Sequence, residues 1–247
     1  MEAHGRRPRG ARHPVRPLVE AIHMTDTRIF PPAGESLADQ AYRLIEDMIV
    51  TMELRPGAWV SEPSLTERLD IGRTPVREAL LRLASDGILV TRPRRGMVVC
   101  EIDLRTQLRV LEARRALESV IVRRAALRRS TDDVETLSQM VAQFRRMKGQ
   151  PDHVPILRLD RAFMDRLLLA SANPFLGAIT PLYALSRRFW LANAARQTRF
   201  DPQEITGYHI AIADAVIAGD AEEAGRLVDA FLDHIEDFTR FVGLELG

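Results

Sequence analysis

Apolar residues recur at helical spacing through most of the chain beyond residue 103, where strand-like alternation is scarce. Turn and capping residues such as Ser130, Pro151, Asn173 and Pro202 divide this part of the chain into segments. The expected helices span residues 103–129, 131–149, 154–172, 174–196, 202–218 and 220–242. Because each segment carries one apolar stripe and the breaks are short, the pattern predicts an all-α antiparallel helical bundle.

The part of the chain before residue 102 has a different pattern. A helical stripe over residues 36–52 is followed by a Pro-Gly turn and by a short expected helix from Glu62 to Leu69. A further helix is expected to begin at Thr74, whose hydroxyl can cap it, because Pro75 suits the first helical position. Two short helices joined by a tight connection predict a helix-turn-helix.

A basic hairpin is expected directly after these helices. Residues 87–90 and 97–100 are short apolar runs that predict two strands, and the turn between them reads RPRRG. A hairpin beside a helix-turn-helix is a wing. The chain is therefore predicted to be mainly α, with an N-terminal winged helix of three helices plus a β-hairpin and a C-terminal helical bundle.

Positive charge gathers in the winged helix. Residues 71–100 hold six arginines against two acidic residues, although the net charge of the whole chain is only +1. This distribution favours a defined nucleic-acid footprint. Arg73 and Arg77 open the third helix, where a guanidinium can bind a guanine edge or a phosphate in the major groove. Considered alone, the helix is equally compatible with two solvated surface arginines.

The segment LRPGAWVSEPSLTERLDIGRTPVREALLRLASDGILVTRPRRGMVV resembles the winged helix of the GntR family of transcription regulators, above all in RTPVREAL and the later RRG. The resemblance implies DNA contacts in the recognition helix and a glycine at the wing tip. The two arginines before that glycine are also expected to contact DNA, because they are positively charged. The expected DNA-binding residues are Arg73, Thr74, Arg77, Arg94, Arg95 and Gly96. Gly72 stands where the family usually has Ser, so one hydroxyl at the helix entry is absent.

The rest of the chain resembles, more loosely, the FCD ligand-binding domain of the FadR branch of that family, through RxxLE from residue 114, DxxF from residue 160 and ANPFL from residue 172. Many FCD domains hold a divalent metal with an Asp, a His four residues later and two further His. Here Met164 and Phe231 replace two of these ligands, and only Asp160 and His209 remain. No metal or other cofactor is therefore expected, unless a register shift brings in His234.

The resemblance also predicts an effector site inside the bundle. The expected effector-binding residues are Arg114, Asp160, Met164, His209, Phe231 and Arg188. Met164 and Phe231 make the wall apolar, and Arg114 offers a fork to a carboxylate or phosphate, which favours a small organic-acid or acyl-type effector. Two alternatives remain open: Arg114 pairs with Glu118 one helical turn on, or Met164 and Phe231 fill the cavity and the domain only dimerises.

Three domains are expected: a disordered basic extension over residues 1–33, a DNA-binding domain over 34–101 and an effector-binding and dimerisation domain over 102–247. The extension is rich in Arg, Pro and Gly, and a natural start at Met24 is the alternative. The single cysteine, Cys100, excludes an intramolecular disulfide and fits a reducing cytoplasm. No apolar run is long enough to span a membrane, so a cytoplasmic protein is expected.

Together these features predict a sequence-specific DNA-binding transcription regulator rather than an enzyme. It is expected to act as a repressor, to bind an inverted-repeat operator in double-stranded DNA as a homodimer, and to respond to a small-molecule effector. One alternative is a ligand-independent DNA-binding dimer. Another is a metal-dependent hydrolase built on Asp160 and His209.

Overall fold

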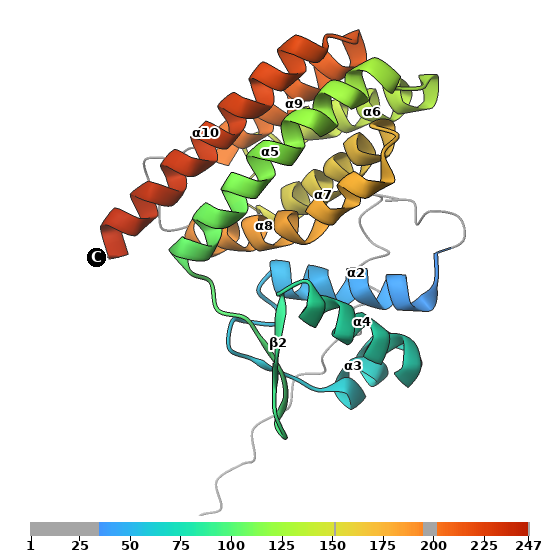
Figure 1. Cartoon of the computed structure of the whole chain (residues 1–247), viewed down its shortest axis with the longest axis vertical. Coiled ribbons are helices and arrows are strands. Elements are labelled where there is room, and N and C mark those ends of the chain that lie inside the picture. The colour runs from blue at the N-terminus through green and yellow to red at the C-terminus, as the bar shows by residue number, and fades with distance from the viewer. Residues whose placement is uncertain (1–34, 151, 195–201, 247) are drawn as a thin grey trace, which may run out of the picture.

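The structure, a computed structural model, describes residues 35–150, 152–194 and 202–246. A winged helix lies at one end of the molecule and a bundle of helices at the other (Figure 1). The mainly-α class and this order of the two parts are confirmed. The predicted disordered extension over residues 1–33 lies outside the described residues.

Three helices and a three-stranded sheet form the winged helix. Its elements are α2 (Leu37–Val50), β1 (Trp59–Val60), α3 (Glu62–Leu69), α4 (Arg73–Ser85), β2 (Leu89–Arg92) and β3 (Gly96–Val99). Ser36 and Ser61 cap α2 and α3, because each hydroxyl accepts a hydrogen bond from the backbone N–H three residues on. β3 is the central strand of the antiparallel sheet, and its Val98 pairs with Trp59 on one side and Val90 on the other.

The recognition helix α4 begins earlier than the sequence pattern predicts. Its first residue is Arg73, and Gly72 occupies the N-cap position with no side-chain hydrogen bond. The predicted cap by Thr74 is therefore wrong. Thr74 and Pro75 lie within the first turn, where the N–H that proline lacks has no intrahelical partner to lose. The strand β1 escapes the sequence pattern altogether, because two residues are too few to show alternation.

Seven helical elements form the bundle over the residues that the structure describes. They are α5 (Leu104–Arg128), α6 (Thr131–Met147), α7 (Val154–Ala170), the 3-10 helix η1 (Pro174–Ile179), α8 (Thr180–Ala194), α9 (Pro202–Ala218) and α10 (Ala221–Leu246). The bounds of α5, α6, α7 and α9 agree with the predicted helices to within two residues. No helix in the described ranges is long and apolar enough to cross a membrane.

Two predicted helix bounds in the bundle are wrong, each for a local reason. The segment predicted as one helix from residue 174 to 196 is divided into η1 and α8. A continuous helix would force the ring of Pro181 against the carbonyl four residues earlier, whereas a proline fits the first turn of a new helix. α10 passes the predicted end at residue 242, because Gly243 weakens a helix without ending it.

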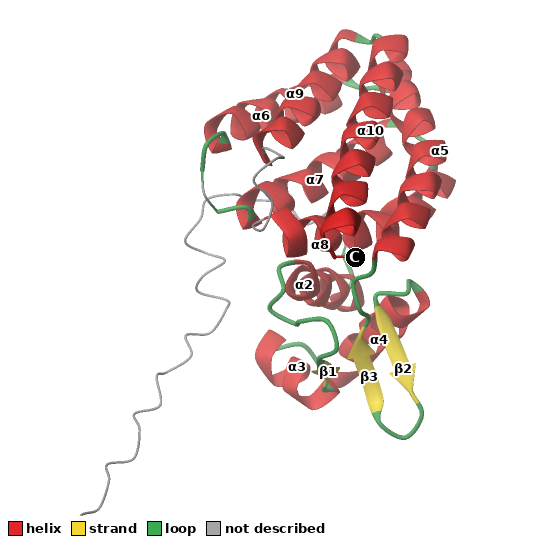
Figure 2. Ribbon diagram, turned by 90° about the vertical axis from the view of Figure 1, so that its left-hand side faces the viewer, coloured by secondary structure: helices red, strands yellow, loops and turns green. Residues whose placement is uncertain are grey.

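Among the described residues, two apolar clusters make up the core. One lies inside the bundle and includes the fully buried Phe144 and Phe163. The other begins in the winged helix around Ile45 and continues into the near end of the bundle through Phe189 and Phe238. α2 lies between the two parts of the molecule and packs against α8 (Figures 1 and 2). The winged helix and the bundle therefore share one continuous core where they meet.

Candidate nucleic-acid interface and buried polar cluster

The recognition helix α4 turns an apolar face to the core and a polar face to solvent. Leu80 and Leu83 are at most 4 % exposed, whereas Arg73, Thr74 and Arg77 are exposed. Burial of the apolar side fixes the rotation of the helix, so these three residues share its solvent face at the N-terminal end. The partial positive charge of a helix N-terminus adds to their attraction for phosphate.

The turn between β2 and β3 is the second exposed basic element. Arg94, Arg95 and Gly96 are all exposed. The backbone N–H of Arg95 donates to the carbonyl of Arg92 at 3.0 Å and closes the turn. Gly96 has a φ of 97°, which a residue without a Cβ adopts at no steric cost. The hairpin points away from the bundle (Figure 2), so its tip is open to a large partner.

The predicted DNA-binding arginines keep their charge uncompensated. Elsewhere in the winged helix, Arg82 pairs with Asp39 at 2.5 Å. The four arginines of the predicted DNA-binding set form no ion pair with any residue that the structure describes. Guanidinium groups that are exposed and unpaired are suited to phosphate and to base edges.

Asp160 on α7 is the centre of a buried polar cluster in the bundle. One carboxylate oxygen lies 3.0 Å from Nε2 of His209 on α9, and the other accepts a hydrogen bond from Arg187 on α8 at 3.3 Å. Burial opposes ionisation, but His209, Arg187 and Arg114 together outweigh it and lower the pKa of Asp160 from 3.8 to about 2. The side chain is therefore an anion at neutral pH.

Arg114 on α5 lies in the same interior and is only 5 % exposed. It donates to the carboxylate of Glu118 one turn on, and its Nη1 donates to the hydroxyl of Ser186 at 2.7 Å. Its guanidinium carbon lies 5.3 Å from the ring centroid of Tyr183 and 5.8 Å from that of Phe231. Arg114 is thus paired with Glu118, which is the alternative to ligand contact that the sequence leaves open.

Apolar side chains enclose His209. Its ring centroid lies 5.1 Å from that of Phe144, 5.4 Å from that of Phe163 and 5.3 Å from that of Phe231. Met164 and Phe231 are each 3 % exposed and belong to the same cluster. Nδ1 of His209 is buried and has no hydrogen-bond partner among the described residues. An unpaired buried polar atom costs free energy, so a polar group of a bound molecule that paired with this nitrogen would be favourable.

Arg188 is the one predicted effector residue that the structure does not bring to this cluster. It is 2 % exposed, and its Nη2 donates to the backbone carbonyls of Cys100 at 2.6 Å and Glu101 at 3.1 Å. Its Nη1 lies 3.2 Å from the sulfur of Cys100. The hydrogen bonds of Arg188 therefore join α8 to the segment that follows the wing, where the winged helix meets the bundle.

The residues present do not fit the metal site of many FCD domains. Nδ1 of His234 on α10 lies 3.3 Å from a carboxylate oxygen of Glu204, so His234 does not join Asp160 and His209. Across the described ranges, no three His, Cys, Asp or Glu side chains converge in a way that could hold a metal ion. Two protein ligands are too few for tight binding of a structural or catalytic ion.

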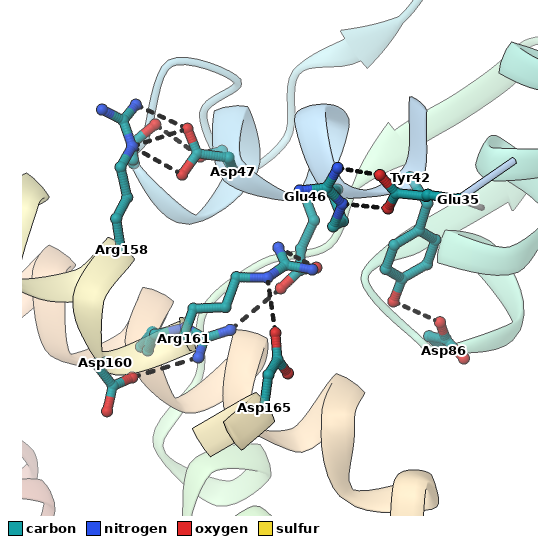
Figure 3. Close-up of polar contacts among 12 residues, drawn as sticks. Glu35, Tyr42, Glu46, Asp47, Asp86, Arg158, Asp160, Arg161 and Asp165 are labelled. Atoms are coloured by element: carbon teal, nitrogen blue, oxygen red, sulfur yellow. Dashed lines mark hydrogen bonds and ion pairs between the residues drawn. The ribbon is translucent and has the colours of Figure 1, made fainter. Parts of the chain in front are cut away.

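Glu46 on α2 is a candidate that sequence reasoning missed. It is 1 % exposed, and its carboxylate lies 2.6 Å from Nη1 of Arg161 and 3.2 Å from Nη2 of Arg187. Figure 3 shows Glu46 and Arg161 directed at one another across the contact between α2 and α7. The only signal in the sequence is a charged residue placed beside Ile45 and Ile49, which belong to the buried face of α2.

Family profiles match both parts of the chain. The profile described as bacterial regulatory proteins, gntR family, matches residues 37–99, and that of the FCD domain matches residues 109–234. The HTH-type transcriptional repressor RspR of Escherichia coli K12 is 28% identical over 211 residues, which cover 83% of this chain and 90% of the relative. The HTH-type transcriptional regulator YdfH of Escherichia coli O6:H1 is 27% identical over 220 residues, covering 87% and 92%.

Solved structures resemble most of the chain. Escherichia coli McbR/YncC has a TM-score of 0.72 at 23% identity, covering 83% of this chain and 98% of that one. A putative GntR transcriptional regulator from Rhodococcus sp. RHA1 has a TM-score of 0.62 at 22% identity, with the same coverage of 83% and 98%. At these identities the likeness supports the fold alone.

Proposed function

The chain belongs to the GntR family of bacterial regulatory proteins and carries an FCD domain, and on that premise we propose that it represses transcription as an effector-responsive homodimer on an inverted-repeat operator. Proteins of this family are DNA-binding transcription regulators, so the chain is a regulator and not an enzyme. Membership of this family excludes the alternative of a metal-dependent hydrolase. The relative RspR is named a repressor, which supports the proposed sign of regulation.

The observation that carries the proposal is the pair of exposed basic elements on the winged helix. Arg73 and Arg77 share the solvent face of α4, and Arg94 and Arg95 stand at the tip of a hairpin directed away from the bundle. A helix of this kind reads base edges in the major groove, while a basic wing holds the phosphate backbone. One winged helix covers one half-site, so a two-fold dimer is needed to bind an inverted repeat with high affinity.

The buried cluster supports an effector that combines an anionic head with an apolar part. Arg114 and Arg187 are buried guanidinium groups paired with carboxylates of the chain, and an anionic head would bind by taking the place of such a carboxylate. Nδ1 of His209 has no partner among the described residues, and Met164 and Phe231 supply apolar wall. An effector changes DNA affinity only if it binds the DNA-competent and incompetent arrangements unequally. This requirement makes the response measurable as a change in operator affinity.

A second candidate function is a regulator that needs no effector. It is favoured by the pairing of Arg114 with Glu118 and Ser186 and by the burial of Met164 and Phe231 in the core. In that protein the bundle would serve dimerisation alone.

Both functions are tested with the purified full chain. Sedimentation velocity should give a dimer, and fluorescence anisotropy should show preference for a fragment of the chain's own promoter region over a scrambled fragment of equal length. A monomer with no such preference would overturn the proposal. A thermal-shift screen with organic acids and acyl thioesters separates the two candidates, because only the effector-responsive protein should be stabilised.

A further inference from the structure

We propose that Arg187 couples the interior of the bundle to the winged helix, so that a change of charge beside Asp160 alters how tightly α2 is held. The inference rests on the proposed effector response and deepens it, because it names the side chain through which an anionic effector would act. In this role Arg187 is a positioning residue that transmits a change rather than a residue that contacts DNA.

The geometry that carries the proposal is one guanidinium shared by two carboxylates from different parts of the molecule. Nη1 of Arg187 donates to Asp160 on α7 at 3.3 Å, and Nη2 donates to Glu46 on α2 at 3.2 Å. The side chain of Arg187 is 7 % exposed, and those of Asp160 and Glu46 are 13 % and 1 % exposed. Charges removed from water in this way interact strongly, because little solvent screens them.

The two distances are nearly equal, so the guanidinium of Arg187 is shared between the two carboxylates. Both exceed the distance of about 2.8 Å that is typical of a charge-assisted hydrogen bond between a guanidinium and a carboxylate. Arg187 can therefore move toward Glu46 when Asp160 loses charge, or toward the bundle when further negative charge arrives there. An anion bound beside Asp160 and His209 would draw Arg187 away from Glu46.

Glu46 has a second partner that makes this exchange feasible. Nη1 of Arg161 on α7 lies 2.6 Å from a carboxylate oxygen of Glu46 (Figure 3). When Arg187 turns away, the buried carboxylate of Glu46 thus keeps one cation and is not left as an isolated charge, which would be strongly unfavourable. The contact between α2 and α8 is then weakened without being abolished.

A change at α2 reaches the recognition helix because α2 and α4 are joined. The hydroxyl of Tyr42 on α2 donates to Asp86 at the end of α4 at 2.7 Å, and the apolar faces of both helices lie in one core. A shift of α2 therefore changes the position of α4 relative to the bundle. In a dimer held together by its bundles, that position sets the spacing of the two winged helices.

The test is a double-mutant cycle read by hydrogen exchange on the full chain, with neither DNA nor effector present. Because Asp160→Asn also lowers the stability of the whole fold, exchange of the backbone amides of residues 37–50 is measured relative to that of residues 131–147 in α6. On this relative scale exchange of α2 should slow several-fold, because Arg187 is left to Glu46. In an Arg187→Met background the same substitution should leave that exchange unchanged. If Arg187→Met does not fold, Glu46→Gln takes its place, because it removes the charge at the other end of the same contact.

The matched control is Asp47→Asn, which breaks a second ion pair between α2 and α7. Asp47 binds Arg158 at 2.8 Å (Figure 3) and does not contact Asp160. The slowing caused by Asp160→Asn should persist in this background. The proposal is overturned if Asp160→Asn leaves α2 unchanged in the wild type, or if its effect survives the loss of Arg187. Neither result would contradict the proposed function, because dimerisation and operator binding are measured separately.

Discussion

The arginines of the recognition helix and those of the bundle interior are the same side chain in opposite surroundings. Arg77 is exposed and forms no ion pair with a described residue, whereas Arg114 and Arg187 are buried and each donates to a carboxylate. An exposed guanidinium keeps its charge for an external partner. The charge of a buried guanidinium is compensated inside the protein. Its loss therefore lowers the stability of the fold and weakens the contact between the winged helix and the bundle.

Arg114→Ala tests the buried side of this comparison and should have the largest effect. It leaves the carboxylate of Glu118, which is 1 % exposed, without its cation. Removing one partner of a buried pair typically costs about 3–5 kcal/mol of unfolding free energy. Urea denaturation measures the loss. The control Arg240→Ala breaks the exposed pair with Glu236 and should change stability little; equal losses in the two variants would contradict the comparison.

The pH dependence of stability gives the next largest effect. The pKa of Asp160 is about 2 in the folded chain, below its ordinary value of 3.8. A lowered carboxyl pKa stabilises the fold above the unfolded value, and this contribution is lost as the pH falls through the folded value. The difference corresponds to about 2 kcal/mol.

Denaturation of the wild type and of Asp160→Asn between pH 7 and pH 2 measures this contribution. The stability of the wild type relative to the variant should be largest above about pH 5 and should shrink as the pH approaches 2. A difference that stays constant over this range would mean that the charge of Asp160 is not what stabilises the cluster.

The sequence predicts where the exposed arginines lie better than it predicts which contacts the buried arginines make. The winged helix depends on local signals, and the motif RTPVREAL places the exposed arginines on α4 although its first residue is Arg73 and not Thr74. The buried cluster depends on which side chains meet in space. Adjacent helical residues point about 100° apart, so Arg187 meets Asp160 while Arg188, the residue that the sequence favoured, meets the segment after the wing.

Glu46 could not have been predicted for a related reason. Its two partners, Arg161 and Arg187, lie more than a hundred residues further along the chain and reach it only because α2 packs against the bundle. Nothing in the local pattern of α2 shows that a partner will cover this face. A buried charge of this kind becomes visible only once both parts of the molecule are assembled.

Arg77→Ala tests the exposed side of the comparison on DNA. If Arg77 reads a base edge, its loss should weaken operator binding by about 1–3 kcal/mol and relax the preference at one base step. Fluorescence anisotropy with the operator fragment and single-base variants measures both effects. Urea denaturation should show an unchanged unfolding free energy, because the side chain is exposed and forms no ion pair with a described residue. A loss of stability comparable to that of Arg114→Ala would show that Arg77 serves the fold instead.

Arg95→Ala should have the smallest effect and should divide the exposed arginines into two kinds. A wing arginine that touches phosphate contributes the same attraction on every sequence, so the variant should lose on the order of 1 kcal/mol equally on operator and on random DNA. The slope of log affinity against log salt concentration should fall by about one, because one fewer counterion is released. Titrations at several salt concentrations on both DNAs measure this. If Arg77→Ala and Arg95→Ala each lost affinity equally on specific and random DNA, the recognition helix and the wing would share one backbone-binding role, and the sequence preference would have to come from the shape of the DNA.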